Sequence, residues 1–317
     1  MTWIAFPLGL AAVLILLAVL DVRRRVADLQ RRLAGEILAS AARAEAVRQE
    51  LAASLRADRP AAEERQQALL ERLAGAQGAI AESAEQSQQQ LSRLMVTRQR
   101  EATREAEALA QLFRGFEPRA PMPSSGYWAL NPTELLELWY VLDHRRPELV
   151  LELGSGVSST WIGYAVERYQ GRLVSVDHDP EYAQRTRAQL RRHGLTGVAE
   201  VRDAPLGPLD VDGESYRWYA PAAFDGLAGV ALLLVDGPPG GTGPHARYPA
   251  FPLLEEKLSG RATVLLDDAD RPDEQEVIRR WTGSTPGLVR EPATLGQLAV
   301  LTYDRPPPTH RGSEEDA

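Results

Sequence analysis

Glycine and acidic residues follow five short apolar runs in the second half of the sequence. The run 148–153 ends at Gly154, Ser155 and Gly156, where small residues let the backbone turn sharply and a ligand approach closely. The runs 172–176, 198–202, 230–235 and 262–266 end at acids, which are Asp177, Asp203, Asp236 and the pair Asp267–Asp268. Each acid alone could be a solvated turn residue or a helix cap. Together they predict a ligand site, because parallel strands present their carboxyl ends at one edge of a sheet.

The spacing of these residues indicates a ligand that carries a ribose. Asp177 lies about twenty residues past the glycine loop, the separation at which an acid meets ribose hydroxyls. Ser159 stands where a dinucleotide fingerprint has its third glycine, and Asp203 adds an acid after the third strand. Both features disfavour a nicotinamide-dependent oxidoreductase, which remains an alternative.

Helical segments alternate with the apolar runs. Helices are expected at 157–169, 180–193 and 272–282, with Pro180 at the start of the second and Gly194 just past its end. Segments 288–290 and 297–303 predict a closing pair of strands around a turn at 292–296. The alternation predicts an α/β fold with a doubly wound, mostly parallel, Rossmann-like sheet.

The run VLELGSGVSS, together with the acids at the strand ends, resembles the first motif of class I S-adenosylmethionine-dependent methyltransferases. The resemblance covers about 121–303 and is greatest to small-molecule O-methyltransferases of the methyltransferase 24 type. It implies that Gly154, Ser155 and Gly156 pass under the methionine part of the cofactor, and that Glu152 supports that loop or the cofactor's amino group. It further implies roles at the ribose, the adenine and the reactive methyl, carried by Asp177 with His178, by Asp203 with Ala204, and by Asp236.

Some branches of this class hold a divalent metal with one acid after the fourth strand and an acid pair after the fifth. Asp236, Asp267 and Asp268 fall in these positions, so the resemblance implies a Mg²⁺ site with oxygen ligands. The alternative is that these acids only cap helices and bind the cofactor. The metal-dependent catechol-type enzymes usually carry asparagine where Asp268 stands, and a lysine shortly after the strand-four acid, where this chain has Pro239 and Gly240. His245 is the nearest candidate general base, unless it is a solvated loop residue.

The N-terminal part of the sequence predicts a membrane anchor at 1–21. Residues 3–20 carry no charge and are just long enough to cross a bilayer as a helix. The arginines at 23–25 would hold the following chain in the cytoplasm. The expected protein is therefore a single-pass protein of the inner or plasma membrane with a cytoplasmic catalytic domain.

Residues 22–115 are rich in strong helix formers and carry heptad positions such as Val26, Leu29 and Leu33. They predict two helices, or one kinked helix, with an interruption at Pro60, which form either a solvated stalk or a coiled coil for homo-oligomerisation or partner docking. A linker at 116–126, a methyltransferase domain at 127–304 and a disordered tail at 305–317 complete the expected organisation.

Composition narrows the function. The chain has no cysteine, which excludes thiolate chemistry and disulfides, and its net charge of −8 argues against a nucleic-acid partner. The expected activity is methylation of an oxygen in a small or sugar-like molecule, for which Tyr216, Trp218 and Tyr219 would line the substrate pocket. A membrane-tethered scaffold with an inactive or cofactor-sensing domain is the alternative of another class.

Overall fold

The structure is a computed structural model of the 317-residue chain. It describes residues 5–54, 59–126, 128–292 and 298–307, and only the backbone at 5–22, 54 and 59–62. The chain divides into two compact units, Met1–Ala106 and Glu107–Ala317.

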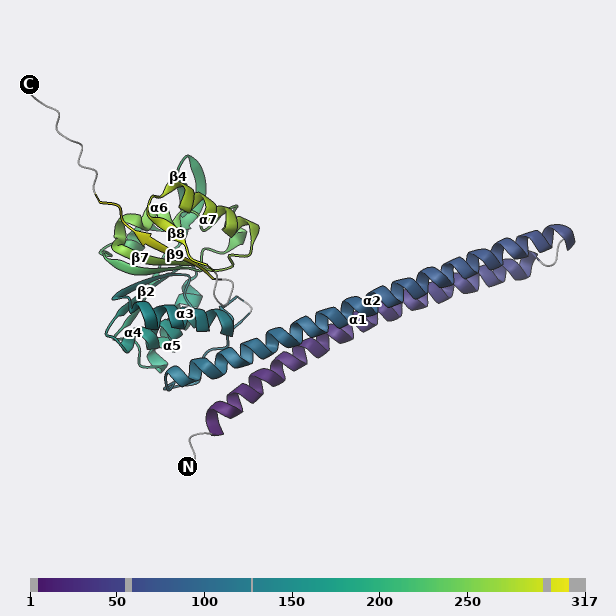
Figure 1. Ribbon diagram of the computed structural model, residues 1–317, viewed down its shortest axis with the longest axis horizontal. Helices are drawn as coiled ribbons and strands as arrows, with labels where there is room; N and C mark the ends of the chain where they lie inside the picture. Colours follow the sequence, from purple (N-terminus) through teal and green to yellow (C-terminus); the bar gives the residue numbers. More distant parts are fainter. Residues whose placement is uncertain (1–4, 55–58, 127, 293–297, 308–317) are drawn as a thin grey trace, which may run out of the picture. The chain divides into compact units, whose positions relative to one another are not determined.

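The first unit consists of helix α1 (Ala5–Ser54) and most of helix α2 (Arg59–Gly115), as Figure 1 shows. Pro60 lies in the first turn of α2, where its missing N–H costs least, so the predicted interruption is confirmed. Leu29 and Leu33 on α1 and Leu73 on α2 are half-buried, whereas Leu94 is 57% exposed. The heptad seam is thus covered at some positions and open at others, and the coiled coil stays a prediction.

Within the described part of the chain, no helix combines the length and the apolar character needed to cross a bilayer. The predicted anchor at 1–21 lies outside the residues whose side chains are described, as does most of the predicted tail at 305–317.

A seven-stranded sheet forms the centre of the second unit, in the order β3-β2-β1-β6-β7-β9-β8. The strands are parallel except β9, which runs antiparallel to both of its neighbours. Their bounds are β1 Leu149–Leu153, β2 Arg172–Asp177, β3 Ala199–Asp203, β6 Val230–Val235, β7 Leu258–Leu266, β8 Leu288–Arg290 and β9 Ala299–Asp304. The predicted parallel α/β sheet with its closing antiparallel strand is confirmed.

Helices cover both faces of this sheet (Figure 1). Helices α3 (Pro132–Arg145), α4 (Val157–Glu167) and α5 (Pro180–Arg192) lie on one face, and α6 (Ala250–Leu254) and α7 (Pro272–Ser284) on the other. Four of the five residues of β1 are buried, as expected for a central strand covered on both sides. Helix α3 was not predicted, although it begins with a capping box in which Asn131 and Glu134 satisfy each other's backbone N–H groups.

A separate hairpin follows β3. Strands β4 (Leu206–Val211) and β5 (Glu214–Tyr219) pair antiparallel around Asp212 and Gly213, both of which have left-handed φ angles. The aromatic residues expected to line the substrate pocket are largely buried, with Trp218 and Tyr219 each 1% exposed. Both pack with strand residues of the sheet and both also line a hollow beside the hairpin, so their contact with a substrate stays a prediction.

The last two turns of α2 belong to this second unit. Leu109 and Leu112 are buried, and a Cβ at Gly115 would lie 2.9 Å from the Trp139 ring. Phe116 stacks on Trp139 with ring centroids 5.1 Å apart.

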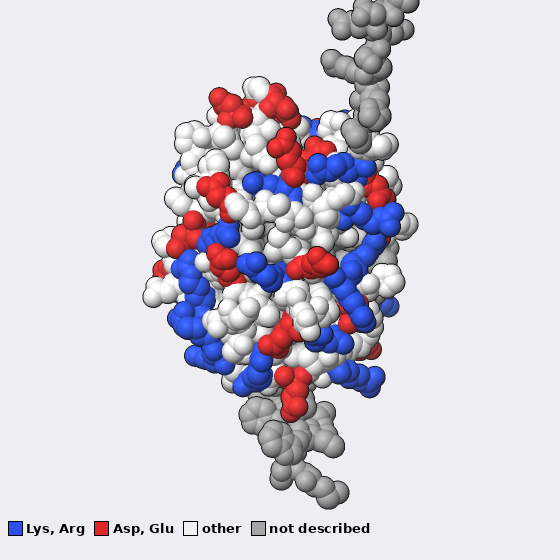
Figure 2. Space-filling model, turned by 90° about the vertical axis from the view of Figure 1, so that its left-hand side faces the viewer, with Lys and Arg blue, Asp and Glu red and all other residues white. Residues whose placement is uncertain are grey.

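Charged side chains of both signs are interspersed on the face of the molecule seen in Figure 2.

Candidate active site

Backbone hydrogen bonds join the carboxyl ends of the five parallel strands that carry the glycine loop and the acids. In each case the amide that ends or follows one strand donates to a carbonyl at the end of its neighbour. The bonds are Ala204 N to Asp177 O (2.7 Å), Gly154 N to Val176 O (2.8 Å), Asp236 N to Leu153 O (2.9 Å) and Asp267 N to Val235 O (3.1 Å). The predicted residues therefore meet at one edge of the sheet.

The glycine loop is held closely against its neighbours. Gly154 has φ +92°, and a Cβ there would lie 2.6 Å from the carbonyl oxygen of Asp236. Asp177 accepts hydrogen bonds on Oδ2 from the backbone N–H (2.9 Å) and hydroxyl (2.6 Å) of Ser155. Its Oδ1 accepts from the Asp179 amide and lies 3.6 Å from Nδ1 of His178. These hydrogen bonds join the glycine loop to the acid at the end of β2.

Glu152 lies fully buried beneath this loop. It accepts hydrogen bonds from the hydroxyls of Ser159 (2.5 Å) and Ser175, and the Ser159 oxygen accepts from the Gly156 amide at 3.0 Å. Burial raises the pKa of Glu152 to about 7, although hydrogen bonds from serine hydroxyls oppose the rise. Of its two expected roles, these contacts are those of loop support. They also give Ser159 a reason to stand where a dinucleotide fingerprint has glycine.

Tyr219 supplies a buried hydroxyl without a hydrogen-bond partner at the same edge. A Cβ at Gly237 would collide with this hydroxyl, so the ring reaches the loop that follows β6. Burial raises the pKa of Tyr219 well above its usual value, and the charges of Asp177 and Asp236 raise it further. A glycine loop near an unpaired hydroxyl that experiences the charges of Asp177 and Asp236 fits a polar ligand such as S-adenosylmethionine.

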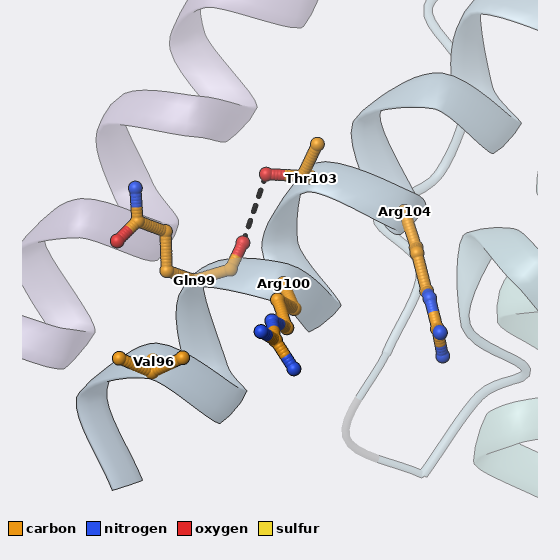
Figure 3. A pocket seen from close by; sticks show the side chains of 5 residues that line it. All are labelled: Val96, Gln99, Arg100, Thr103 and Arg104. Carbon is orange, nitrogen blue, oxygen red and sulfur yellow. Dashed lines mark hydrogen bonds between the residues drawn. The ribbon is translucent and has the colours of Figure 1, made fainter. Parts of the chain in front are cut away.

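Asp203, the acid at the end of β3, contacts an arginine rather than the glycine loop. Asp203 forms an ion pair with Arg187 at 2.8 Å and is half-exposed, while Ala204 is buried. A hollow of about 330 Å³ lies on the hairpin and the residues next to it, lined by Pro205–Leu209 and Trp218–Pro221. A second hollow, of about 420 Å³, lies on α2 in the first unit, where Thr103 donates to the Gln99 carbonyl (Figure 3). Its lining holds no acid or histidine, so it is no candidate for catalysis.

Three carboxylates gather where the Mg²⁺ site was predicted. One oxygen of each of Asp236, Asp267 and Asp268 lies within 4.8 Å of the others. Burial raises the pKa of Asp236 and of Asp267. The negative charge of Asp267 raises the pKa of Asp236 further, and the charge of Asp268 does the same for Asp267. The sequence therefore predicted the meeting of these acids correctly.

The cation that meets these carboxylates in the structure is the guanidinium of Arg247. Its Nη2 lies 3.3 Å from Oδ1 of Asp236 and 3.0 Å from Oδ2 of Asp268, and its Nη1 donates to the Asp267 carbonyl at 2.8 Å. The side chain is almost fully buried. Burial alone would lower the pKa of Arg247, but Asp236 and Asp268 raise it above its usual value. Sequence reasoning missed Arg247, which no motif singled out.

Two further buried acids surround this group. Glu134, in the first turn of α3, is 5% exposed, and burial together with the charge of Asp267 raises its pKa to about 7. Glu274 on α7 lies 3.9 Å from Nε of Arg247. His245, the predicted base, has a left-handed φ of 48°, and its backbone N–H donates to Asp273 of α7 at 3.4 Å. Arg247, two residues further on, is the side chain of this loop that reaches the carboxylates.

Comparison with known proteins agrees with this site. A family model described as a methyltransferase domain, Methyltransf_24, matches residues 151–269, which run from β1 to the acid pair after β7. No curated protein matches the chain.

Several solved structures are similar to the chain at low identity. A methyltransferase from Geobacter sulfurreducens is 17% identical with a TM-score of 0.43, over 63% of this chain and 88% of its own. An O-methyltransferase from Streptomyces achromogenes involved in tomaymycin synthesis, solved with S-adenosylmethionine, is 19% identical with a TM-score of 0.40, over 64% and 90%. An O-methyltransferase from Bacillus cereus is 14% identical with a TM-score of 0.43, over 64% and 91%.

The family match covers the strands, the glycine loop and the acids whose contacts are described above. Residues 151–269 accordingly match a methyltransferase domain, and they lie in a unit built on a mostly parallel, Rossmann-like sheet.

Proposed function

We propose that this enzyme methylates an oxygen atom of a small or sugar-like molecule. The observation that carries the proposal is the joint arrangement of Gly154, Asp177 and Tyr219 at the carboxyl edge of the sheet. We infer that a ligand passes along the backbone of this loop at Gly156, where a Cβ would meet nothing within 4 Å, and that Asp177 accepts hydrogen bonds from ribose hydroxyls. The unpaired Tyr219 hydroxyl offers one further hydrogen bond between Asp177 and Asp236.

S-adenosylmethionine, when bound, supplies a methyl group on a positively charged sulfur. The residues of the chain then have two tasks, which are to align the acceptor oxygen with that methyl group and to remove the acceptor's proton. Asp236 stands at the end of β6 with its side chain 15% exposed, so it is within reach of an acceptor at the open edge. In the proposed step the acceptor hydroxyl would give its proton to Asp236 while its oxygen forms a bond to the methyl carbon, the carbon–sulfur bond breaks and the sulfur leaves as a neutral thioether.

Calorimetric titration of S-adenosylmethionine into the full-length protein, purified in mild detergent, tests the cofactor site. We expect micromolar affinity that falls at least tenfold in Asp177→Asn, because this variant loses charge at the predicted ribose contact. Asp210→Asn, on the exposed side of β4, is the matched control and should leave the affinity unchanged. A folded protein that releases no heat, or equal affinities in both variants, would contradict the proposal.

We further propose that residues 1–21 anchor the enzyme in the inner or plasma membrane and that the domain faces the cytoplasm. The uncharged stretch 3–20 and the arginines at 23–25 support this proposal. The full-length protein should remain in the membrane fraction after alkaline washing, whereas the double variant Leu14→Arg, Leu17→Arg should leave it. Release of both proteins by the wash would refute the anchor.

A further inference from the structure

The guanidinium of Arg247 lies where the three carboxylates converge. It contacts the side chains of Asp236 and Asp268 and the backbone of Asp267, so all three acids of the cluster meet the same group. Arg271 also pairs with Asp268, at 2.7 Å, but its side chain is 52% exposed. Of these two arginines, Arg247 is the one that is buried among the carboxylates.

A guanidinium in this place differs from a metal ion in two ways. It stays protonated under all conditions in which the protein is folded, and its planar fork suits two carboxylates at once. It also competes with a metal, because Nη2 already lies 3.3 Å from Asp236 and 3.0 Å from Asp268, whereas Mg²⁺ would need such carboxylate oxygens at about 2.0–2.1 Å from its own centre. A divalent ion could enter only if Arg247 left its buried contacts with several acids.

We propose that Arg247 is the permanent cation of this site and holds Asp236 and Asp268 in position without a divalent metal. Arg247 is a positioning residue, since it acts through Asp236 and is itself almost fully buried. The placement of Asp236 beside the acceptor rests on the proposed function, whereas the exclusion of metal from the cluster does not. The domain would therefore bind its ligands equally well with and without divalent cations.

The wild-type protein gives the first test. Binding of Mn²⁺ to the full-length protein is measured by the loss of the electron paramagnetic resonance signal of free Mn²⁺, with Asp236→Asn alongside. We expect no binding that depends on Asp236. A Mn²⁺ site in the wild-type protein that disappears in Asp236→Asn would overturn the proposal.

The Arg247→Ala variant gives the second test, because it removes the guanidinium and leaves three carboxylates around the vacated space. We expect this variant to bind Mn²⁺ at least tenfold more tightly than the wild-type protein and to lose that binding again in Arg247→Ala, Asp236→Asn. Arg271→Ala changes the net charge equally and removes the exposed partner of Asp268, so it should gain no such site. A folded Arg247→Ala that gains no Mn²⁺ affinity would show that Arg247 is only a structural ion-pair partner.

The two proposals fail separately. If Arg247→Ala does not fold, the wild-type titration alone decides the exclusion of metal. S-adenosylmethionine titration with and without EDTA should give the same affinity in the wild-type protein. Absent cofactor binding together with the expected Mn²⁺ results would refute the proposed function and leave the role of Arg247 intact. Cofactor binding that is lost in EDTA would refute the role of Arg247 alone.

Discussion

Two features of the structure require glycine at position 154, which are its left-handed backbone conformation and the close approach of the Asp236 carbonyl. Its φ of +92° is a backbone conformation that other residues rarely adopt, and a Cβ would lie 2.6 Å from the Asp236 carbonyl. We expect Gly154→Ala to lower the free energy of unfolding by about 1–3 kcal/mol and to weaken cofactor binding. Urea denaturation measures the change. Gly207→Ala, where a Cβ would meet nothing within 4 Å, is the control, and equal losses in both variants would contradict the argument.

Glu152 makes the stability of the fold depend on pH. Its pKa rises from the ordinary value of about 4.5 to about 7 because the folded protein buries it. The folded state therefore holds a proton that the unfolded state releases, so the stability that Glu152 contributes is fully present below about pH 4.5 and is lost as the pH rises through 7.

The size of this decline follows from the shift in pKa, and corresponds to a loss on the order of 3 kcal/mol for Glu152. We expect Glu152→Gln to make the fall in melting temperature between pH 5 and 8 less steep. Part of the fall should remain, because Glu134 has a similarly raised pKa. Glu256→Gln, at an exposed position, should leave the profile unchanged. A Glu152→Gln profile as steep as that of the wild-type protein would count against the buried proton.

At the scale of elements, the sequence predicted those strands and helices whose pattern is local. Runs such as 230–235 are short, apolar and bounded by glycine or an acid, and each became a strand of the sheet. Helix α3 was missed because nearly all residues from 134 to 139 are buried, which leaves no polar face to reveal a helical period. The hairpin β4–β5 had a signal in Asp212-Gly213, but Pro208 weakened the strand pattern before it.

In the candidate site, too, residues with a local sequence pattern could be predicted and the others could not. The acids could be placed because each follows a strand, and parallel strands bring their ends together. The contact of Arg247 with Asp268 joins two loops that are 21 residues apart and depends on how the loop after β6 folds back. Glu134 comes from a helix that was not predicted at all. Neither residue carries a local pattern that would assign it to the site.

The end of α2 gives the prediction at this scale. Leu112 is fully buried in the second unit, whereas Leu94, on the same helix, is 57% exposed. We expect Leu112→Ala to lower the free energy of unfolding of that unit by about 2–5 kcal/mol, because a cavity replaces the lost side chain. Leu94→Ala should change it by less than about 0.5 kcal/mol. Tryptophan fluorescence during denaturation reports the unit that contains Trp139 and Trp161, and a small effect at Leu112 would show that α2 is not part of its core.

At the scale of the whole molecule, the heptad positions of α1 predict self-association. Leu29 and Leu33 are half-buried on one seam, while Leu38 is 70% exposed. We expect Leu29→Glu, Leu33→Glu to lower the oligomeric state of the full-length protein in sedimentation velocity, since charges on a seam disfavour its burial. Leu38→Glu is the control. Identical sedimentation of the wild-type protein and the double variant would favour a helical segment that does not associate through this seam.

The row of amide bonds along the carboxyl edge of the sheet has a consequence for how the active site transmits disturbance. Each of these loops is fastened to the strand beside it, from Ala204 across Gly154 and Asp236 to Asp267. A loop that opens must break a bond to its neighbour as well as its own contacts, so the loops share their local stability. The regions that we propose to bind adenine, sulfur and acceptor would then become more or less mobile as one cooperative unit, and a ligand bound at one end would reduce the motion of the other.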